Sequence, residues 1–220
     1  LCRGDHSTPH EILGAHADRR DGHQGIVVRA LHPDAVAAAC LLADRSVAME
    51  RVDARGVFEA FLPQQSFPLS YRLRFEFADG QSWERGDPYA FLPTLVEADL
   101  YYFGEGTHRR LWQVLGSHLR SVDGVEGASV AVWAPNARRV SVIGDFCGWD
   151  GRLLPMRSLG TSGVFELFVP GVCAGARYKY EIKTASGELR IKADPFAFAC
   201  EHPPANASIV TSSTYEWRDG

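Results

Sequence analysis

Short runs in which hydrophobic and polar residues alternate dominate the chain and indicate β-strands. The clearest run is YRLRFEF at 71–77, where apolar and aromatic side chains fall on one face and charged side chains on the other. Other short runs are rich in β-branched or aromatic residues and are bounded by turn residues. They lie at 25–31, 38–44, 57–63, 129–135, 139–146, 164–170 and 178–184. This pattern predicts an all-β protein.

The order of these runs is repeated along the chain. The matched segments are ILGAH (12–16) with VLGSH (114–118), GVFEAFLP (56–63) with GVFELFVP (163–170), and DPYAF (87–91) with DPFAF (194–198). The offset is 102 for the first pair and 107 for the other two, so five extra residues enter the second copy. They fall between Asn136 and Gly163, around GDFCGWDGRLLPM at 144–156. We interpret the chain as a tandem duplication whose functional difference lies in this segment.

Several short strands with tight-turn signals in about 100 residues are typical of a β-sandwich. We therefore predict two tandem immunoglobulin-like β-sandwiches, at 1–105 and 125–220, joined by a short helical linker at 106–124. Within the linker, the apolar spacing in THRRLWQVLGSHL at 107–119 predicts a short helix. Trp133 is expected in the core of the second sandwich.

Composition restricts the function classes. The formal net charge of −4 gives no general attraction for nucleic acid or an anionic membrane surface, so neither is an expected partner. The chain has no apolar run long enough to span a membrane, and its first residues lack the apolar core of a signal peptide. Its five cysteines are widely spaced, which favours reduced thiols in a cytoplasmic protein. Because neither end looks like a natural terminus, we expect a fragment of a longer protein.

The chain shows no catalytic or metal-binding signature, and no cofactor is predicted. His10 and His16 have no third ligand nearby and are expected to cap or pack beside a turn. Paired carboxylates can serve glycoside chemistry, but their strand and turn positions here favour an ordinary solvated surface. The carboxylates concerned are Asp145, Asp150, Glu166 and Glu181. We therefore assign no catalytic residue.

The candidate binding residues are Trp149 and Lys179. Trp149 follows Gly148 in a loop-like context that supports a buried core residue poorly, and a tryptophan face can stack on a sugar ring. Lys179 lies in a strand between two tyrosines that point the other way, and it can donate to sugar hydroxyls. The alternatives are that Trp149 plugs the end of the sandwich and that Lys179 is an ordinary exposed strand residue.

Both copies resemble known protein families. The segments at 129–156, 163–171, 178–188 and 192–208, which include SVAVWAPNARRVSVIGDFCGWDG and KADPFAF, resemble a family-48 carbohydrate-binding module. The first copy, from HEILGAH to DPYAFLPTL, resembles the additional amino-terminal sandwich of bacterial 1,4-α-glucan branching enzymes. DLYYFGEGTHRRLWQVLGSH at 99–118 resembles the joint between the two in those enzymes.

The resemblance implies the non-catalytic amino-terminal half of an enzyme that cuts an α-1,4-glucan and rejoins it through an α-1,6 bond. Such a retaining reaction needs two carboxyl groups, which belong to a (β/α)₈ barrel. That barrel is not contained in these residues. They are therefore expected to bind α-1,4-glucan or glycogen, to pack on the barrel and to be inactive alone. The alternative is a free-standing glycogen-binding or scaffolding module.

Three positions depart from the module that the second copy resembles. Cys147 stands where the family usually has asparagine, and Leu189 stands where glycogen-binding members of the kinase-regulatory type have a second tryptophan. Asn206 lies one position from their asparagine. With one aromatic platform lost, we expect weak glucan binding, which linkage to a catalytic domain on a polymeric substrate can strengthen.

Overall fold

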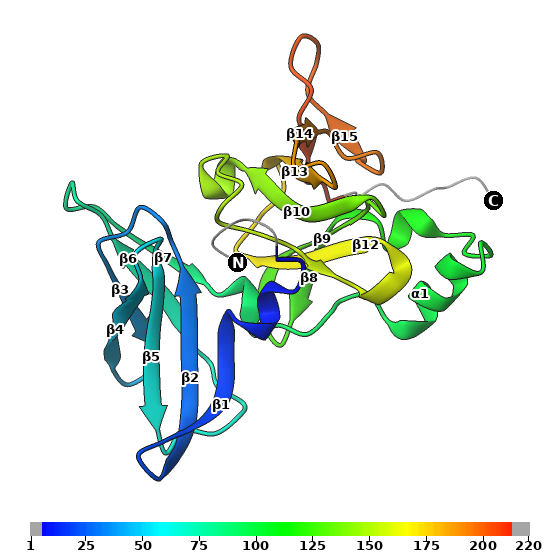
Figure 1. The fold of residues 1–220 in the computed structure, drawn as a ribbon. Coiled ribbons are helices and arrows are strands. Elements are labelled where there is room, and N and C mark those ends of the chain that lie inside the picture. The colour runs from blue at the N-terminus through cyan, green and yellow to red at the C-terminus, as the bar shows by residue number, and fades with distance from the viewer. Residues whose placement is uncertain (1–5, 213–220) are drawn as a thin grey trace.

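The chain folds into two β-sandwiches, and the short α-helix that connects them in sequence lies beside the second sandwich, as Figure 1 shows. The computed structural model describes residues 6–212, so the outermost residues of both predicted sandwiches lie outside the description. Within the described part, strands make up most of the regular structure. This arrangement confirms the predicted all-β class.

The first sandwich contains strands β1 to β7. Their bounds are β1 (Gly14–Arg20), β2 (His23–Leu31), β3 (Ala37–Leu41), β4 (Ser46–Asp53), β5 (Val57–Pro63), β6 (Arg72–Glu76) and β7 (Ser82–Gly86). The hydrogen-bonded order is β1-β2-β5-β4-β3-β6-β7. The beginning of β4 pairs with β3 and its end pairs with β5, so this strand joins the two layers. Buried Val28, Phe58 and Phe75 belong to the core between them.

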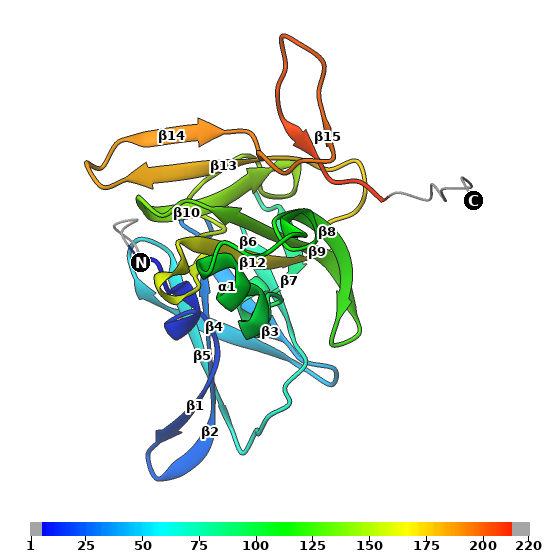
Figure 2. The same cartoon turned by 90° about the vertical axis from the view of Figure 1, so that its right-hand side faces the viewer.

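The second sandwich has a four-stranded and a five-stranded sheet. The first contains β8 (Gly116–Val122), β9 (Val125–Trp133), β11 (Arg157–Ser158) and β12 (Val164–Pro170) in the order β11-β12-β9-β8. The second contains β10 (Ala137–Gly144), β13 (Arg177–Thr184), β14 (Leu189–Lys192), β15 (Ala199–Cys200) and β16 (Ser208–Ile209). Its order is β10-β13-β16-β15, with β14 also beside β13, and Figure 2 shows β13 and β14 as an extended hairpin.

Short 3₁₀-helices occupy five connections within the described residues. They are η1 (Pro9–Glu11), η2 (Pro88–Ala90), η3 (Leu111–Gln113), η4 (Asp145–Cys147) and η5 (Gly160–Ser162). None of the helices in this part of the chain is long and apolar enough to cross a membrane.

The repeat seen in the sequence is also a repeat of turn geometry. Gly14 and Gly116 begin β1 and β8 with left-handed φ angles of 91° and 94°. A Cβ atom at Gly14 would lie 2.5 Å from the carbonyl oxygen of Tyr89, so the close approach requires glycine. His16 Nε2 donates to the Leu13 carbonyl oxygen at 3.0 Å, and His118 makes the corresponding bond to Leu115 at 2.9 Å. The prediction that His16 supports a turn is therefore confirmed.

The repeated Asp-Pro segments form buried polar turns. Asp87 accepts hydrogen bonds from the Tyr71 hydroxyl at 2.5 Å and the Tyr89 backbone N–H at 3.0 Å. The second copy repeats both contacts with Asp194, Tyr178 and Phe196, at 2.6 and 2.8 Å. Burial raises the pKa of both aspartates, while the donors oppose that shift. These buried carboxyl groups hold corresponding turns in the two sandwiches.

The linker helix lies earlier in the chain than the sequence predicted. The α-helix α1 spans Glu97–Gly104, whereas 107–119 contains only the single turn η3. Gly116 already begins β8, so residues assigned to the linker join the second sandwich. The prediction was wrong because a helical spacing of apolar residues over one turn also suits a 3₁₀ turn, and the left-handed Gly116 cannot continue a helix.

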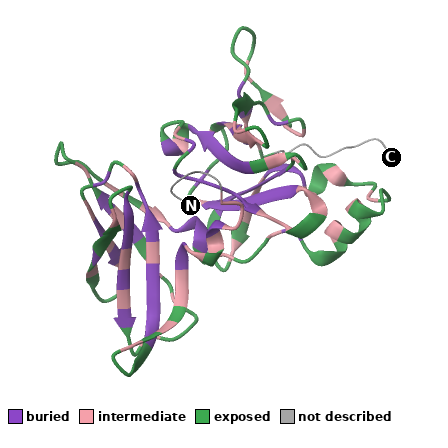
Figure 3. Cartoon of the chain, viewed as in Figure 1, coloured by how far each residue is buried: buried purple, intermediate pink, exposed green. Residues whose placement is uncertain are grey.

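Two burial predictions were also wrong. Trp133 was expected in the core, yet it is 54% exposed at the end of β9. Alternation could not place it, because both faces of β9 are covered up to Val132. Glu166 was expected on a solvated surface, yet it is fully buried, as is most of β12 in Figure 3. The segment after η2 covers it.

The joint between the sandwiches explains the burial of Glu166. Its carboxylate accepts from the Thr94 backbone N–H at 3.0 Å, from the Thr94 hydroxyl at 2.8 Å and from Arg157 Nε at 2.9 Å. Arg157 also donates to the carbonyl oxygen of Phe91 at 3.0 Å. His10, expected at a turn, lies beside this joint with its ring edge-on to Tyr89. Residues 91–94 are thus fixed to the second sandwich.

Candidate functional site

Trp149 lies in a tight loop that follows β10. Gly148 and Trp149 both have left-handed backbones, with φ angles of 60° and 63°. A residue other than glycine in this conformation costs on the order of 1 kcal/mol or more, so contacts elsewhere must stabilise it. The Trp149 backbone N–H donates to the carbonyl oxygen of Gly144 at 3.0 Å, which closes the turn.

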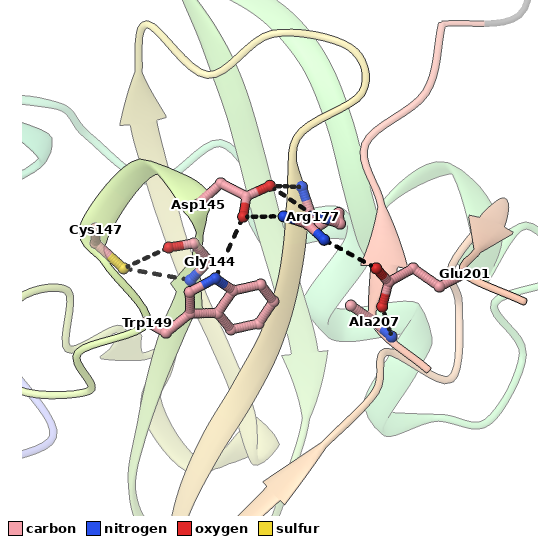
Figure 4. Close-up of polar contacts among 7 residues, drawn as sticks. All are labelled: Gly144, Asp145, Cys147, Trp149, Arg177, Glu201 and Ala207. Carbon is pink, nitrogen blue, oxygen red and sulfur yellow. Dashed lines mark hydrogen bonds and ion pairs between the residues drawn. The ribbon is translucent and has the colours of Figure 1, made fainter. Parts of the chain in front are cut away.

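Cys147 supports this turn from inside. The Gly144 backbone N–H donates to its sulfur at 3.3 Å, as Figure 4 shows. The side chain is buried, and burial raises the pKa of the thiol, which keeps it uncharged. Cys147 therefore stabilises the loop and does not present a polar group to a ligand. Cys40, Cys147, Cys173 and Cys200 are all free thiols, while Cys2 lies outside the described residues.

The indole ring of Trp149 is held in one orientation with part of its surface exposed. Its Nε1 donates to Asp145 Oδ1 at 3.2 Å, and 37% of the residue is accessible. The Asp145 carboxylate in turn accepts from Arg177 Nε and Nη2, both at 3.0 Å. These bonds hold the pKa of Asp145 below its usual value. The ring is thus anchored at its polar edge, which leaves the ring face available for stacking.

A second pair of polar contacts continues across the sheet. Arg177 Nη1 donates to Glu201 Oε1 at 3.1 Å, and the Glu201 carboxylate also accepts from the Ala207 backbone N–H at 3.0 Å. Lys179 Nζ donates to Asn206 Oδ1 at 2.5 Å. Arg177 and Lys179 are two residues apart on β13 and therefore share a face of the sheet. Both side chains tie the 201–207 loop to that face.

The structure brings the two predicted binding residues to one region of the molecule. Trp149 reaches Arg177 through Asp145, and Lys179 lies two residues further along the same strand. Leu189 on β14 pairs with Lys183 of β13 and therefore lies on this face of the sheet too. Trp149 and Lys179 remain predictions as ligand contacts.

Sequence reasoning missed Asp145 and Arg177 as parts of this site. The sequence favours an ordinary solvated carboxylate at Asp145 and gives no signal for Arg177. Their contact spans 32 positions in the chain, so no local pattern could reveal it. The four-residue spacing from Asp145 to Trp149 in one turn was the only available signal.

The chemistry of the site favours binding over proton transfer. The backbone N–H of Ala207 and the guanidinium of Arg177 hold the pKa of Glu201 below its usual value, as Arg177 does for Asp145. A general acid in glycoside chemistry needs a raised pKa, so neither carboxylate suits that role. Among residues 6–212, no group of three or more His, Cys, Asp or Glu side chains is arranged to hold a metal ion.

An exposed aromatic surface was not predicted. It comprises Tyr101 and Tyr102 on α1 and Trp133 at the end of β9, with Phe103 edge-on to Trp133 at a centroid distance of 5.9 Å. No residue of α1 is fully buried, but Leu100 and Phe103 are partly buried and pack against Leu115 and Ala131 of the second sandwich. Figure 1 shows α1 on the side of the second sandwich that lies away from the first sandwich.

Comparison with known proteins identifies both halves of the chain. Residues 1–89 match the family described as alpha-1,4-glucan branching enzyme GlgB, N-terminal domain, and residues 114–197 match carbohydrate-binding module 48 (isoamylase N-terminal domain). The whole chain is 51% identical to the 1,4-alpha-glucan branching enzyme GlgB of Rhodococcus jostii (strain RHA1) and 48% identical to that of Nocardia farcinica (strain IFM 10152).

The match to these relatives is partial in length. The chain covers 30% of the Rhodococcus protein and 29% of the Nocardia protein. Crystal structures of pullulanase from Anoxybacillus sp. LM18-11 show a looser likeness, with 15% identity over 90% of this chain and 28% of that chain and a TM-score of 0.38, which adds nothing to the assignment. The chain therefore belongs to the GlgB branching-enzyme family as its amino-terminal region, with a family-48 carbohydrate-binding module in its second half.

Proposed function

We propose that the chain is the non-catalytic amino-terminal half of a cytoplasmic 1,4-α-glucan branching enzyme and guides α-glucan chains such as glycogen. The observation that carries the proposal is the anchored, partly exposed ring of Trp149 within the half that matches a carbohydrate-binding module. Lys179 lies on the adjoining face, where its ammonium group can donate to sugar hydroxyls. Asp145 and Arg177 fix the ring so that little side-chain freedom is lost on binding.

The proposal also gives the exposed aromatic surface a partner. The relatives are about three times as long as this chain, and their name describes a branching activity. α1 packs on the second sandwich through the partly buried Leu100 and Phe103, which leaves the large rings of Tyr101 and Tyr102 exposed on its other side. We assign the surface around Tyr101, Tyr102 and Trp133 to contact with a catalytic barrel in the longer protein.

A free-standing glycogen-binding or scaffolding module is the alternative. It shares the glucan site but has no barrel to contact. The coding sequence downstream of Gly220 separates the two: a barrel with paired carboxylates supports the branching enzyme, and a stop codon supports the free module.

Glucan binding is tested by electrophoresis of the 220-residue protein through gels with and without glycogen. We expect weak retardation that Trp149→Ala abolishes and Lys179→Ala reduces. Trp112→Ala, which removes an exposed tryptophan outside the site, is the matched control and should migrate like the wild type. Equal retardation of the Trp149→Ala variant and the wild type would assign Trp149 to packing. In an iodine-stain assay the protein should show no branching activity.

A further inference from the structure

The loop that carries Trp149 is packed against the first sandwich. Leu153 and Leu154, from the end of this loop, belong to one buried hydrophobic cluster with Leu31, Val57 and Tyr89 of the first half. The core of the second sandwich therefore continues through the loop into the first sandwich. Removing the first sandwich would expose the inner side of the loop.

Two polar contacts also connect the loop to the first sandwich. Arg152 Nη2 donates to Asp34 Oδ2 at 2.7 Å, while the same guanidinium also holds Asp150. The Tyr89 hydroxyl donates to the carbonyl oxygen of Pro155 at 3.1 Å in a buried position. Asp34 lies in the turn after β2 and Tyr89 lies in η2, so both partners belong to the first half.

The loop needs such support more than an ordinary connection does. It stands where the first copy has only the short turn between β3 and β4, and its own regular pairing begins at a bridge from Pro155 to Ser141 and at the two-residue strand β11. Trp149 also has an unfavourable left-handed backbone, which persists only where surrounding contacts determine it. A local opening of this loop would release that strain and move the indole ring.

We propose that the first sandwich positions the Trp149 loop for glucan binding, with Asp34 and Tyr89 as positioning residues that do not touch the glucan. This inference rests on the proposed role of Trp149. The first half then contributes to glucan binding by supporting a loop of the second half. It does not need to contact the sugar itself. The contacts of Asp34 and Tyr89 set how often the loop is closed, and only the closed loop presents the anchored ring.

The primary test is hydrogen exchange of the amides between Trp149 and Leu154 in the 220-residue protein. Asp34→Asn should accelerate exchange by about two- to five-fold, because the ion pair is exposed. Tyr89→Phe should accelerate it by roughly five-fold, because a buried hydrogen bond is lost while the ring remains. Asp34→Glu should restore protection. Asp44→Asn, which breaks an exposed ion pair with Arg45 in a remote turn, is the matched control and should leave the loop unchanged.

The functional test compares retardation by glycogen for the Asp34→Asn/Tyr89→Phe double variant, Trp149→Ala and the wild type. We expect the double variant to bind more weakly than the wild type while exchange in β12 stays as in the wild type. Unchanged loop exchange in both single variants would overturn the inference, as would faster loop exchange with unchanged retardation. If Trp149→Ala itself leaves retardation unchanged, the proposed function fails, which is a separate result.

Discussion

The two sandwiches share the same turns and differ in one segment. Gly14 and Gly116, and likewise Asp87 and Asp194, occupy corresponding positions and make the same kinds of contact. In the first half, residues 46–53 form the regular strand β4, which joins the two layers. In the second half, the connection before the corresponding segment is longer and presents Trp149, and the chain rejoins the sheet only at Pro155 and β11.

This difference shows how the duplicated fold gained a candidate site. The shared contacts close each sandwich, so they tolerate little change. The five added residues fall in a connection, where extra length costs little and new side chains reach the surface. The first sandwich, which is the other copy of the duplication, then supports the strained loop.

The largest expected effect concerns the buried aspartates. Asp194 accepts from two tyrosine hydroxyls and one backbone N–H, whereas Asp87 accepts from one of each. Asp194→Ala should lower the free energy of unfolding by about 3 kcal/mol or more and Asp87→Ala by about 2 kcal/mol, because buried donors lose their acceptor. Urea unfolding followed by circular dichroism measures both. Equal losses would show that the extra donor, Tyr180, contributes nothing.

The next effect separates two glutamates at equivalent positions. Glu166 is buried at the joint, where it pairs with Arg157, while Glu59 forms ion pairs with Arg20 and Arg29 near the surface. Glu166→Gln should cost about 3 kcal/mol, because it leaves a buried guanidinium without its charge partner. Glu59→Gln should cost about 1 kcal/mol, since solvent screens the exposed parts of its partners. Urea unfolding measures both costs. A larger loss of unfolding free energy for Glu59→Gln than for Glu166→Gln would contradict the assignment of the joint.

A smaller effect depends on pH. Burial, together with the nearby Arg85, lowers the pKa of His32 from 6.5 to about 4. The unfolded chain therefore binds more protons as the pH falls, and stability present above pH 6.5 is lost as the pH approaches 4. His32→Phe keeps the ring contacts with Phe75 and Phe77 but cannot titrate. It should remove on the order of 1 kcal/mol of the stability difference between pH 7 and pH 4.5. An unchanged difference would show that other groups cause the loss.

The smallest effect concerns the left-handed backbone at Trp149. Trp149→Gly and Trp149→Ala remove the same ring, but only glycine adopts a φ of 63° without strain. The glycine variant should therefore be more stable than the alanine variant by about 1 kcal/mol, measured by thermal unfolding. Neither variant should be retarded by glycogen. An alanine variant as stable as the glycine variant would show that the loop relaxes and stores no backbone strain.

The sequence was sufficient for the fold class and the repeat, because both depend on local patterns. Period-2 alternation gives strands, and the Asp-Pro and Leu-Gly segments mark corresponding turns. It was not sufficient for Trp133 or Glu166, since their burial depends on how α1 and residues 91–94 lie over the second sandwich. Local spacing also misplaced the linker helix.

The candidate site was only partly accessible to the same reasoning. A tryptophan between glycine and aspartate indicated a surface loop, which led to Trp149. Asp145 and Arg177 could not be found in this way, because the bond between them depends on β10 and β13 being neighbours. The support from Asp34 and Tyr89 depends on packing between the sandwiches, for which single residues carry no signal.

The most direct test of the central claim follows the tryptophan indole N–H signals by NMR while maltoheptaose is added to the ¹⁵N-labelled protein. The chain has five tryptophans, so each signal can be assigned by substitution. The signal of Trp149 should shift progressively and saturate, while those of Trp112 and Trp133 stay in place. A stationary Trp149 signal, or a shift confined to Trp112 or Trp133, would contradict the assignment of the glucan site.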